Sequence, residues 1–232
     1  MITIRKAEER GVTDLDWLKS WHTFSFNQYY DSKYMHFSHL RVMNDDILKP
    51  GEGFGFHPHN DMEIITFILD GEIEHKDSMG NKAVIKRGEI QKMTAGTGVM
   101  HSEFNASKEE LLHLYQIWVF PDKKGLTPSY EQKTIDYEKS KKGFQLLASN
   151  QQLNGEIKIH QDAKMYHAIV QPSQEISLDV DISRSIWIQA IKGTIEVNGN
   201  ELSGGDGAAI VNESRISVTG KTDAELLLFD LK

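Results

Sequence analysis

Cysteine is absent from the 232 residues of the chain. Its absence excludes a disulfide framework, a thiolate zinc site and a cysteine nucleophile, and it fits a reducing compartment. Long apolar runs are absent as well, because no stretch approaches the roughly 20 residues of a membrane helix. No apolar segment follows the basic pair Arg5 and Lys6, so we expect no secretory signal, no membrane partner and a cytoplasmic location.

Positive charge is also in short supply. The chain has 26 Lys and Arg residues against 34 Asp and Glu residues, which gives a formal net charge of -8. A surface of this sign repels phosphate backbones, so nucleic acid is not expected as a partner. The remaining composition, 39% hydrophobic and 26% charged, is typical of a soluble globular protein of one large domain or two small ones.

Helical periodicity is scarce, and short strands dominate the pattern. Apolar or alternating runs rich in β-branched and aromatic residues predict strands, and they lie at 38–43, 63–69 and 111–120. Glycine turn signals such as Asp70-Gly71 separate these runs. The one helical turn that we expect spans 14–19, with Asp14 as its N-cap. Strands of this density favour an all-β barrel or sandwich.

A polar, lysine-rich segment at 134–143 divides the strands into two sets, and we interpret it as a linker between domains at 1–133 and 144–232. Short sequences echo each other across the two halves. Phe67-Ile-Leu-Asp-Gly71-Glu-Ile-Glu matches Gln189-Ala-Ile-Lys-Gly193-Thr-Ile-Glu, and Lys86-Arg-Gly88-Glu matches Ser203-Gly-Gly205-Asp. The matches predict an internal repeat of two related β-barrels.

Two pairs of polar side chains in the first half are candidate metal ligands. His57 is followed two residues later by His59, and His101 is followed two residues later by Glu103. Residues i and i+2 of a strand project from the same face, so two adjacent strands would aim three imidazoles and one carboxylate at one point. Such ligands suit a divalent transition ion, namely Fe, Mn, Co, Ni, Cu or Zn. Four ligands on a six-coordinate ion leave two positions free for water, dioxygen or substrate, whereas a closed tetrahedral zinc site would be structural.

Other residues compete for these roles. Asp61 and Glu63 share strand parity with the first histidine pair, so either is an alternative carboxylate ligand or a hydrogen-bond partner that orients an imidazole. We prefer Glu103 because its spacing from His101 mirrors the first pair. Further histidines are candidate neighbours of the site or of the barrel mouth: His22, His36, His39, His75 and His113. The second half has no His-x-His pair, so we expect a barrel of the same fold without a metal site.

The stretch Gly51-x5-His57-x-His59, continuing to Gly71, resembles the first motif of the cupin superfamily. Gly88-x5-Thr-Ala-Gly96, continuing to His101-x3-Asn105, resembles the second motif with two extra residues before the histidine. The usual glutamate of the first motif is shifted by one residue, to Glu63, and Glu103 supplies the carboxylate instead, which is similar to pirins. The pirin resemblance extends through Trp21-His-Thr-Phe-Ser-Phe26, His57-Pro-His59-Asn-Asp-Met-Glu63, Asp77-Ser-Met-Gly80, Thr94-Ala-Gly-Thr-Gly98 and Leu112-His-Leu-Tyr-Gln-Ile-Trp118. It weakens after about Thr134.

The resemblance implies a bicupin of two jelly-roll barrels, with one divalent transition metal per chain, iron first among the candidates. The metal would lie in the N-terminal barrel, on His57, His59, His101 and Glu103, and the C-terminal barrel would be degenerate. Several bacterial pirins are associated with quercetin 2,3-dioxygenase activity. The resemblance therefore implies an enzyme that opens a flavonol ring with dioxygen and releases carbon monoxide, with Glu103 as the base for the substrate hydroxyl.

The expected partners are a small aromatic substrate and dioxygen. Apolar side chains near the motifs are candidates either for stacking on that substrate or for the barrel core: Phe24, Phe26, Phe54, Phe56 and Met93. Two alternative functions stay open. One is a metal- or redox-responsive interaction protein, as eukaryotic pirins are described, and the other is a cupin enzyme acting on a different small molecule.

Overall fold

The computed structural model describes all 232 residues, which divide into two compact units. The first unit, here called the N-barrel, consists of Gly11–Ile135 with Ile159–Gln161. The second unit, the C-barrel, consists of Met1–Arg10, Asp136–Lys158 and Asp162–Lys232. This division differs from the expected domains, 1–133 and 144–232, at two places, because the first ten residues and residues 159–161 each belong to the other unit.

Strand pairing and hydrogen bonding explain both differences. Strand β1 (Ile2–Arg5) pairs antiparallel with β20 (Gly207–Val211) and so completes a sheet of the C-barrel. At the other place, the backbone N–H of His160 lies 3.3 Å from the Glu63 carboxylate, and the His160 carbonyl accepts a hydrogen bond from the backbone of Asp122. Both are contacts between residues far apart in the chain, which local turn signals do not reveal.

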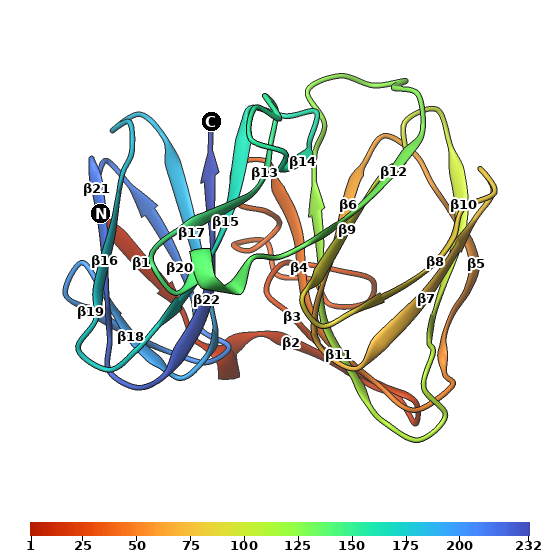
Figure 1. Cartoon of the computed structure of the whole chain (residues 1–232), viewed down its shortest axis with the longest axis horizontal. Helices are drawn as coiled ribbons and strands as arrows, with labels where there is room; N and C mark the ends of the chain where they lie inside the picture. The colour runs from red at the N-terminus through yellow and green to blue at the C-terminus, as the bar shows by residue number, and fades with distance from the viewer. The chain divides into compact units, whose positions relative to one another are not determined.

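The N-barrel is built from two antiparallel sheets that face each other (Figure 1). Its strands are β2 (Gly11–Asp14), β3 (Leu18–His22), β4 (Leu40–Leu48), β5 (Gly53–His59), β6 (Glu63–Asp70), β7 (Glu72–Asp77), β8 (Lys82–Lys86), β9 (Glu89–Thr94), β10 (Val99–Asn105), β11 (Leu112–Val119) and β12 (Ser129–Thr134). The larger sheet has the order β12-β9-β6-β11-β4-β3-β2, and the smaller has the order β5-β10-β7-β8.

The C-barrel repeats this plan. Besides β1 and β20 it contains β13 (Gln145–Ser149), β14 (Ile157–Lys158), β15 (Ala163–Val170), β16 (Glu175–Asp179), β17 (Ser185–Lys192), β18 (Thr194–Val197), β19 (Asn200–Ser203), β21 (Arg215–Gly220) and β22 (Ala224–Leu231). A seven-stranded sheet, β1-β20-β17-β22-β15-β13-β14, again faces a four-stranded one, β16-β21-β18-β19. Each barrel thus has the same two sheet sizes, and the prediction of an all-β bicupin is confirmed.

The echoed glycines occupy equivalent turns in the two barrels. Gly71 joins β6 to β7 with φ 77°, and Gly193 joins β17 to β18 with φ 72°. A Cβ atom at Gly71 would lie 2.6 Å from the Leu111 carbonyl oxygen, and one at Gly193 would lie 2.2 Å from that of Asp223. Only glycine combines this left-handed backbone with so close an approach, which is why the repeat is visible in the sequence at these positions.

The helical turn expected at 14–19 is wrong. Asp14 ends β2, and it pairs across a tight connection with Lys19 of β3. Strand pairing therefore overrides the local capping signal. The structure instead has a 3-10 helix, η1 (Ala7–Glu9), and one short helix, α1 (Tyr137–Ser140), inside the segment expected to be a linker. The Asp136 side chain caps α1 by accepting hydrogen bonds from the backbone of residues 138 and 139.

The two barrel interiors differ in polarity at matching positions. In the N-barrel a row of directly opposed residues crosses the large sheet, from Gln91 on β9 through Thr66 on β6 to Gln116 on β11. The corresponding row of the C-barrel is Ala208, Ile188 and Leu228, which are opposed in the same way and belong to one buried apolar cluster. The C-barrel is therefore packed with hydrocarbon where the N-barrel keeps hydrogen-bonding groups.

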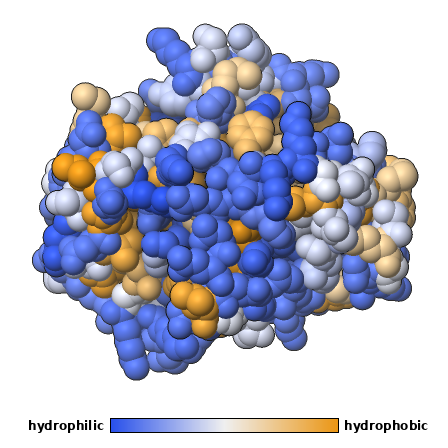
Figure 2. Space-filling model, turned by 90° about the horizontal axis from the view of Figure 1, so that it is seen from above, coloured by the Kyte–Doolittle hydropathy of each residue, from blue (hydrophilic) through white to orange (hydrophobic).

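The surface seen in Figure 2 is mostly hydrophilic, with hydrophobic side chains in small scattered groups. Scattered exposed apolar side chains are normal for a globular protein and do not by themselves mark a binding face. None of the helices has both the length and the apolar character needed to cross a membrane.

Candidate metal centre

Three neighbouring strands of the four-stranded sheet each contribute a pair of polar side chains to one face. On the central strand, β10, His101 lies opposite His57 of β5, and Glu103 lies opposite His75 of β7. Directly opposed residues share a face, and so do residues two apart on one strand. His59 and Asp77 therefore extend the same face, to give a six-residue patch of four imidazoles and two carboxylates.

Four members of this patch, His57, His59, His101 and Glu103, were expected from the sequence, and His75 was expected only as a neighbour. The missed signal was its spacing, because His75 and Asp77 stand two residues apart like the other two pairs. In the structure the His75 Nε2 lies 3.2 Å from Asp77 Oδ2, and both side chains are buried. The pair was missed because nothing local in the sequence says that β7 lies beside β10.

An irregularity in β5 sets the direction of the first histidine pair. The register between β10 and β5 shifts between His101 and Glu103, so that three residues of β5 span the distance of two on β10. Such a bulge bends a strand and re-aims the side chains next to it. A Cβ atom at Gly53 would lie 2.3 Å from the Glu103 carbonyl oxygen, so glycine allows the two backbones to approach closely at the end of the bulged strand.

The imidazoles of His57, His59 and His101 form one compact group. One candidate ligand atom from each lies within 4.8 Å of the others, and the ring centroids are 4.4 to 4.9 Å apart. Glu103 belongs to a second group of the same spread, with His101 and His75. His101 is common to both groups, so the four expected ligands are neighbours, but the structure does not gather all of them into a single group.

The nitrogen atoms of this group suit a metal ion. His57 Nδ1 lies 2.7 Å from the Gly55 carbonyl oxygen and donates its hydrogen there, so the lone pair is on Nε2. That Nε2 lies 3.0 Å from His101 Nε2, while His101 Nδ1 is buried without a hydrogen-bond partner. Two ring nitrogens facing each other in this way need a shared proton or a shared cation. A donor set of three imidazole nitrogens fits a divalent transition ion.

Electrostatics keep two of these rings neutral. Burial, and then the neighbouring imidazoles His101 and His57, lower the pKa of His59 to about 4. Burial, and then His57 and His75, lower the pKa of His101 to about 3. At neutral pH both rings are therefore uncharged and have a lone pair available for coordination.

Glu103 is held across the barrel by the polar row of the opposite sheet. Its Oε1 accepts hydrogen bonds from Gln91 Nε2 at 2.7 Å and Thr66 Oγ1 at 3.2 Å, and its Oε2 accepts one from Gln116 Nε2 at 2.8 Å. A carboxylate has about four acceptor positions. Oε2 therefore has one acceptor position left, for a hydrogen-bond donor or a metal ion. The Glu103 side chain is only 2% exposed, so this position is shielded from bulk water.

The alternative carboxylates point elsewhere. Glu63 is fully buried, 3.5 Å from Lys92 Nζ and 3.4 Å from His160 Nδ1. Asp61 accepts a hydrogen bond from the backbone of Gly125. Neither residue belongs to a metal-binding group or to the lining of the cavity described below.

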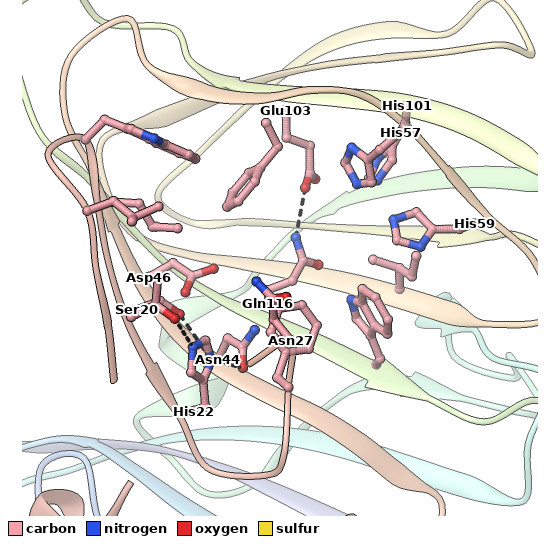
Figure 3. A pocket seen from close by; sticks show the side chains of 18 residues that line it. Ser20, His22, Asn27, Asn44, Asp46, His57, His59, His101, Glu103 and Gln116 are labelled. Atoms are coloured by element: carbon pink, nitrogen blue, oxygen red, sulfur yellow. Dashed lines mark hydrogen bonds between the residues drawn. The ribbon is translucent and has the colours of Figure 1, made fainter. Parts of the chain in front are cut away.

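The three imidazoles and Glu103 open onto a cavity of about 300 Å³ between the two sheets. Figure 3 shows the imidazoles at one end, and Ser20, His22, Asn44 and Asp46 at the other. Apolar side chains complete the wall, and they include Trp17, Phe26, Phe54, Ile64 and Trp118. A hydrophobic cavity with polar groups at both ends is suited to a small, flat ligand that is polar at its two ends.

The outcomes for the other sequence candidates are mixed. Phe26 and Phe54 line the cavity, whereas Phe24 and Met93 are buried in the core and Phe56 is 58% exposed.

Among the candidate neighbouring histidines, His22 lines the cavity. His113 instead binds Asp45 at 2.6 Å, and His36 and His39 lie outside the cavity lining.

Comparison with known proteins agrees with this architecture. The family model described as Pirin matches residues 3–119, and the model described as Quercetinase C-terminal cupin domain matches residues 146–231. A protein of Escherichia coli K12 named quercetin 2,3-dioxygenase is 49% identical over 231 residues, which cover 100% of this chain and 99% of the relative. A Pasteurella multocida protein named putative quercetin 2,3-dioxygenase is 43% identical over 100% of both chains.

Two solved structures are also very similar. The crystal structure of YhhW from Escherichia coli has a TM-score of 0.96 and 49% identity, and covers 100% of this chain and 98% of that one. The bacterial pirin YhhW in complex with nickel(II) has a TM-score of 0.95 and 48% identity, with coverage of 100% and 99%. The resemblance stated from the sequence motifs is confirmed, and the chain belongs to the pirin family.

Proposed function

We propose that this pirin is a metal-dependent dioxygenase that opens the ring of a quercetin-like flavonol with dioxygen and releases carbon monoxide. One observation carries the proposal: neutral imidazoles with converging nitrogens and a buried carboxylate open onto an aromatic-walled cavity. The names of the Escherichia coli and Pasteurella multocida relatives support the same chemistry.

His57, His59 and His101 would hold the ion, and Glu103 is the proposed fourth ligand. Iron is the first candidate, and nickel is a strong alternative because the related bacterial pirin was crystallised with nickel(II). When bound, a divalent transition metal would lower the pKa of the flavonol 3-hydroxyl and provide a partner for dioxygen.

Glu103 is the proposed base for the hydroxyl proton. Its Oε2 has acceptor capacity left, and the amides of Gln91 and Gln116 keep its two oxygens in place. A base held in this way does not have to reorganise when the proton arrives.

Trp118 positions the planar substrate. Its ring meets the rings of His59 and Phe26 edge to face, with centroids 5.0 and 5.5 Å away. This arrangement forms a rigid apolar wall next to the imidazoles, against which a flat ring system can lie while water is excluded.

The test uses protein loaded separately with Fe(II) or Ni(II). Quercetin loss, dioxygen uptake and carbon monoxide release should follow a 1:1:1 ratio. His101→Ala should lose the bound metal and the activity, whereas the matched control His36→Ala should keep both, because His36 lies outside the cavity and bonds Ser38. Absence of carbon monoxide from every loaded form would reject the proposal. One bound metal per chain without flavonol turnover would leave the two alternatives, the redox-responsive interaction protein and a cupin enzyme that acts on a different small molecule.

A further inference from the structure

The end of the cavity opposite the imidazoles has a polar lining that the proposed reaction does not use. It comes from three neighbouring strands of the seven-stranded sheet: Thr13 on β2, Ser20 and His22 on β3, and Asn44 and Asp46 on β4. In Figure 3 the side chains of Ser20, His22, Asn44 and Asp46 lie on the far side of Gln116 from His59. We call this set the distal polar cluster.

Most of the distal polar cluster is hydrogen-bonded internally. His22 Nε2 lies 2.8 Å from Thr13 Oγ1, and His22 Nδ1 lies 2.9 Å from Asn44 Oδ1. The ring is also stacked on Tyr29 at 6.3 Å. Both nitrogens of His22 therefore have partners, and the imidazole is fixed in position.

Asp46 is the exception within the cluster. It is 3% exposed, and it lies directly opposite Ser20, whose hydroxyl hydrogen-bonds its carboxyl group. Its Oδ1 atom is buried and has no hydrogen-bond partner. A buried carboxyl oxygen without a partner is unfavourable, so a hydrogen-bond donor that reached the Asp46 carboxyl group from the cavity would be stabilised there.

We propose that Asp46, positioned by Ser20, forms a subsite that binds a phenolic hydroxyl group on the part of the substrate remote from the metal. This inference rests on the proposed function and deepens it, since it assigns a residue that would recognise a hydroxyl group of the flavonol away from the metal. The neighbouring carboxylate Asp45 does not share the role, because it is bonded to His113 and Tyr115.

Burial raises the pKa of Asp46 to about 7. The carboxyl group therefore exists in both protonation states near neutrality. In either state it has an oxygen that accepts a hydrogen bond from a phenol, so the subsite works across the neutral range.

The test compares the binding of two flavonols to metal-loaded protein without dioxygen. Quercetin carries hydroxyls on its outer rings, and 3-hydroxyflavone carries only the hydroxyl expected at the metal. Quenching of the cavity residues Trp17 and Trp118 reports binding of either compound. The native chain should bind quercetin at least about tenfold more tightly, since sites that hydrogen-bond a substrate hydroxyl discriminate against analogues lacking it.

Asp46→Leu should bring the quercetin affinity close to that of 3-hydroxyflavone and leave 3-hydroxyflavone binding within about twofold. Asp46→Asn keeps an acceptor oxygen and should retain part of the discrimination. Asp45→Asn, the matched control, should retain all of it.

Equal affinity of the native chain for both compounds, binding of neither, or full discrimination in Asp46→Leu would overturn the inference. Turnover is measured separately. Tighter binding of quercetin than of 3-hydroxyflavone without carbon monoxide release would reject the dioxygenase and support the Asp46 subsite. Carbon monoxide release with equal affinity for the two flavonols would support the dioxygenase and reject the subsite.

Discussion

Replacing Asp46 with Asn should flatten the dependence of the folding free energy on pH. The Asp46 side chain is buried, and its pKa in the folded chain is raised from 3.8 to about 7. Desolvation is the main cause, opposed by the Ser20 hydrogen bond and reinforced by the charges of Asp45 and Glu103, while His113 lowers the value. The folded chain therefore keeps a proton between pH 3.8 and 7 that the unfolded chain has already released.

The sign follows from this difference in bound protons. Because the folded state binds more protons in that window, the free energy of unfolding falls as the pH rises through it. Each pH unit below 7 corresponds to about 1.4 kcal/mol, so the Asp46 contribution between pH 5.5 and 8 is a loss of about 2 kcal/mol. An asparagine at this position does not titrate and should remove the loss.

The assay is urea unfolding of the metal-free native chain and of Asp46→Asn at pH 5.5 and pH 8. Other titrating groups are common to both proteins, so their effects cancel in the difference. Asp46→Asn should gain about 2 kcal/mol relative to the native chain when the pH is raised from 5.5 to 8. The same pH dependence in both proteins would refute the burial argument for Asp46.

Four further predictions concern the metal centre and the barrels. His59→Ala should lose most bound metal by elemental analysis yet keep the β-sheet circular dichroism spectrum, because strand packing and not the ion makes the core; full metal occupancy would contradict the ligand assignment. Glu103→Gln should retain some metal and lose most of the flavonol turnover, and unchanged turnover would remove the proposed base. Lys92→Met should destabilise the N-barrel by about 3–5 kcal/mol in urea unfolding, because the buried carboxyl group of Glu63 loses its lysine partner. A loss below about 1 kcal/mol would contradict a stabilising role for this buried pair. Anomalous scattering from metal-loaded crystals should show one ion per chain and none in the C-barrel, and a second ion there would contradict the assignment of that barrel as degenerate.

The histidine pairs could be recognised from the sequence because strand geometry is local. The period of two residues puts His57 with His59, and His101 with Glu103, whatever the rest of the fold does. The glycine turns at Gly71 and Gly88 are local in the same sense, since each needs a left-handed backbone. These signals were sufficient to predict an all-β protein and the expected ligands, whereas the jelly-roll bicupin was predicted from the resemblance to the cupin motifs.

Pairing between distant strands was not accessible in the same way. The place of His75 beside Glu103 depends on β7 pairing with β10, and Asp46 reaches the cavity because β4 lies next to β3 in the opposite sheet. Neither neighbour is close in sequence. The pairing of Asp14 with Lys19 is local by contrast, yet it too was missed, because the capping signal at Asp14 predicted a helical turn where the chain forms a hairpin.

The first strand of the chain completes a sheet whose other strands are made last. Ile4 of β1 pairs with Ala208, and both Ile2 and Ile4 pack on the apolar cluster of the C-barrel. At ribosomal rates of about 5–20 residues per second, roughly 10 to 40 seconds pass between the synthesis of β1 and the synthesis of its partner strand β20. Until β20 has been synthesised, the apolar side chains of β1 therefore lack their strand partner, and a tag or chaperone placed beside β1 would act on the folding of the C-barrel.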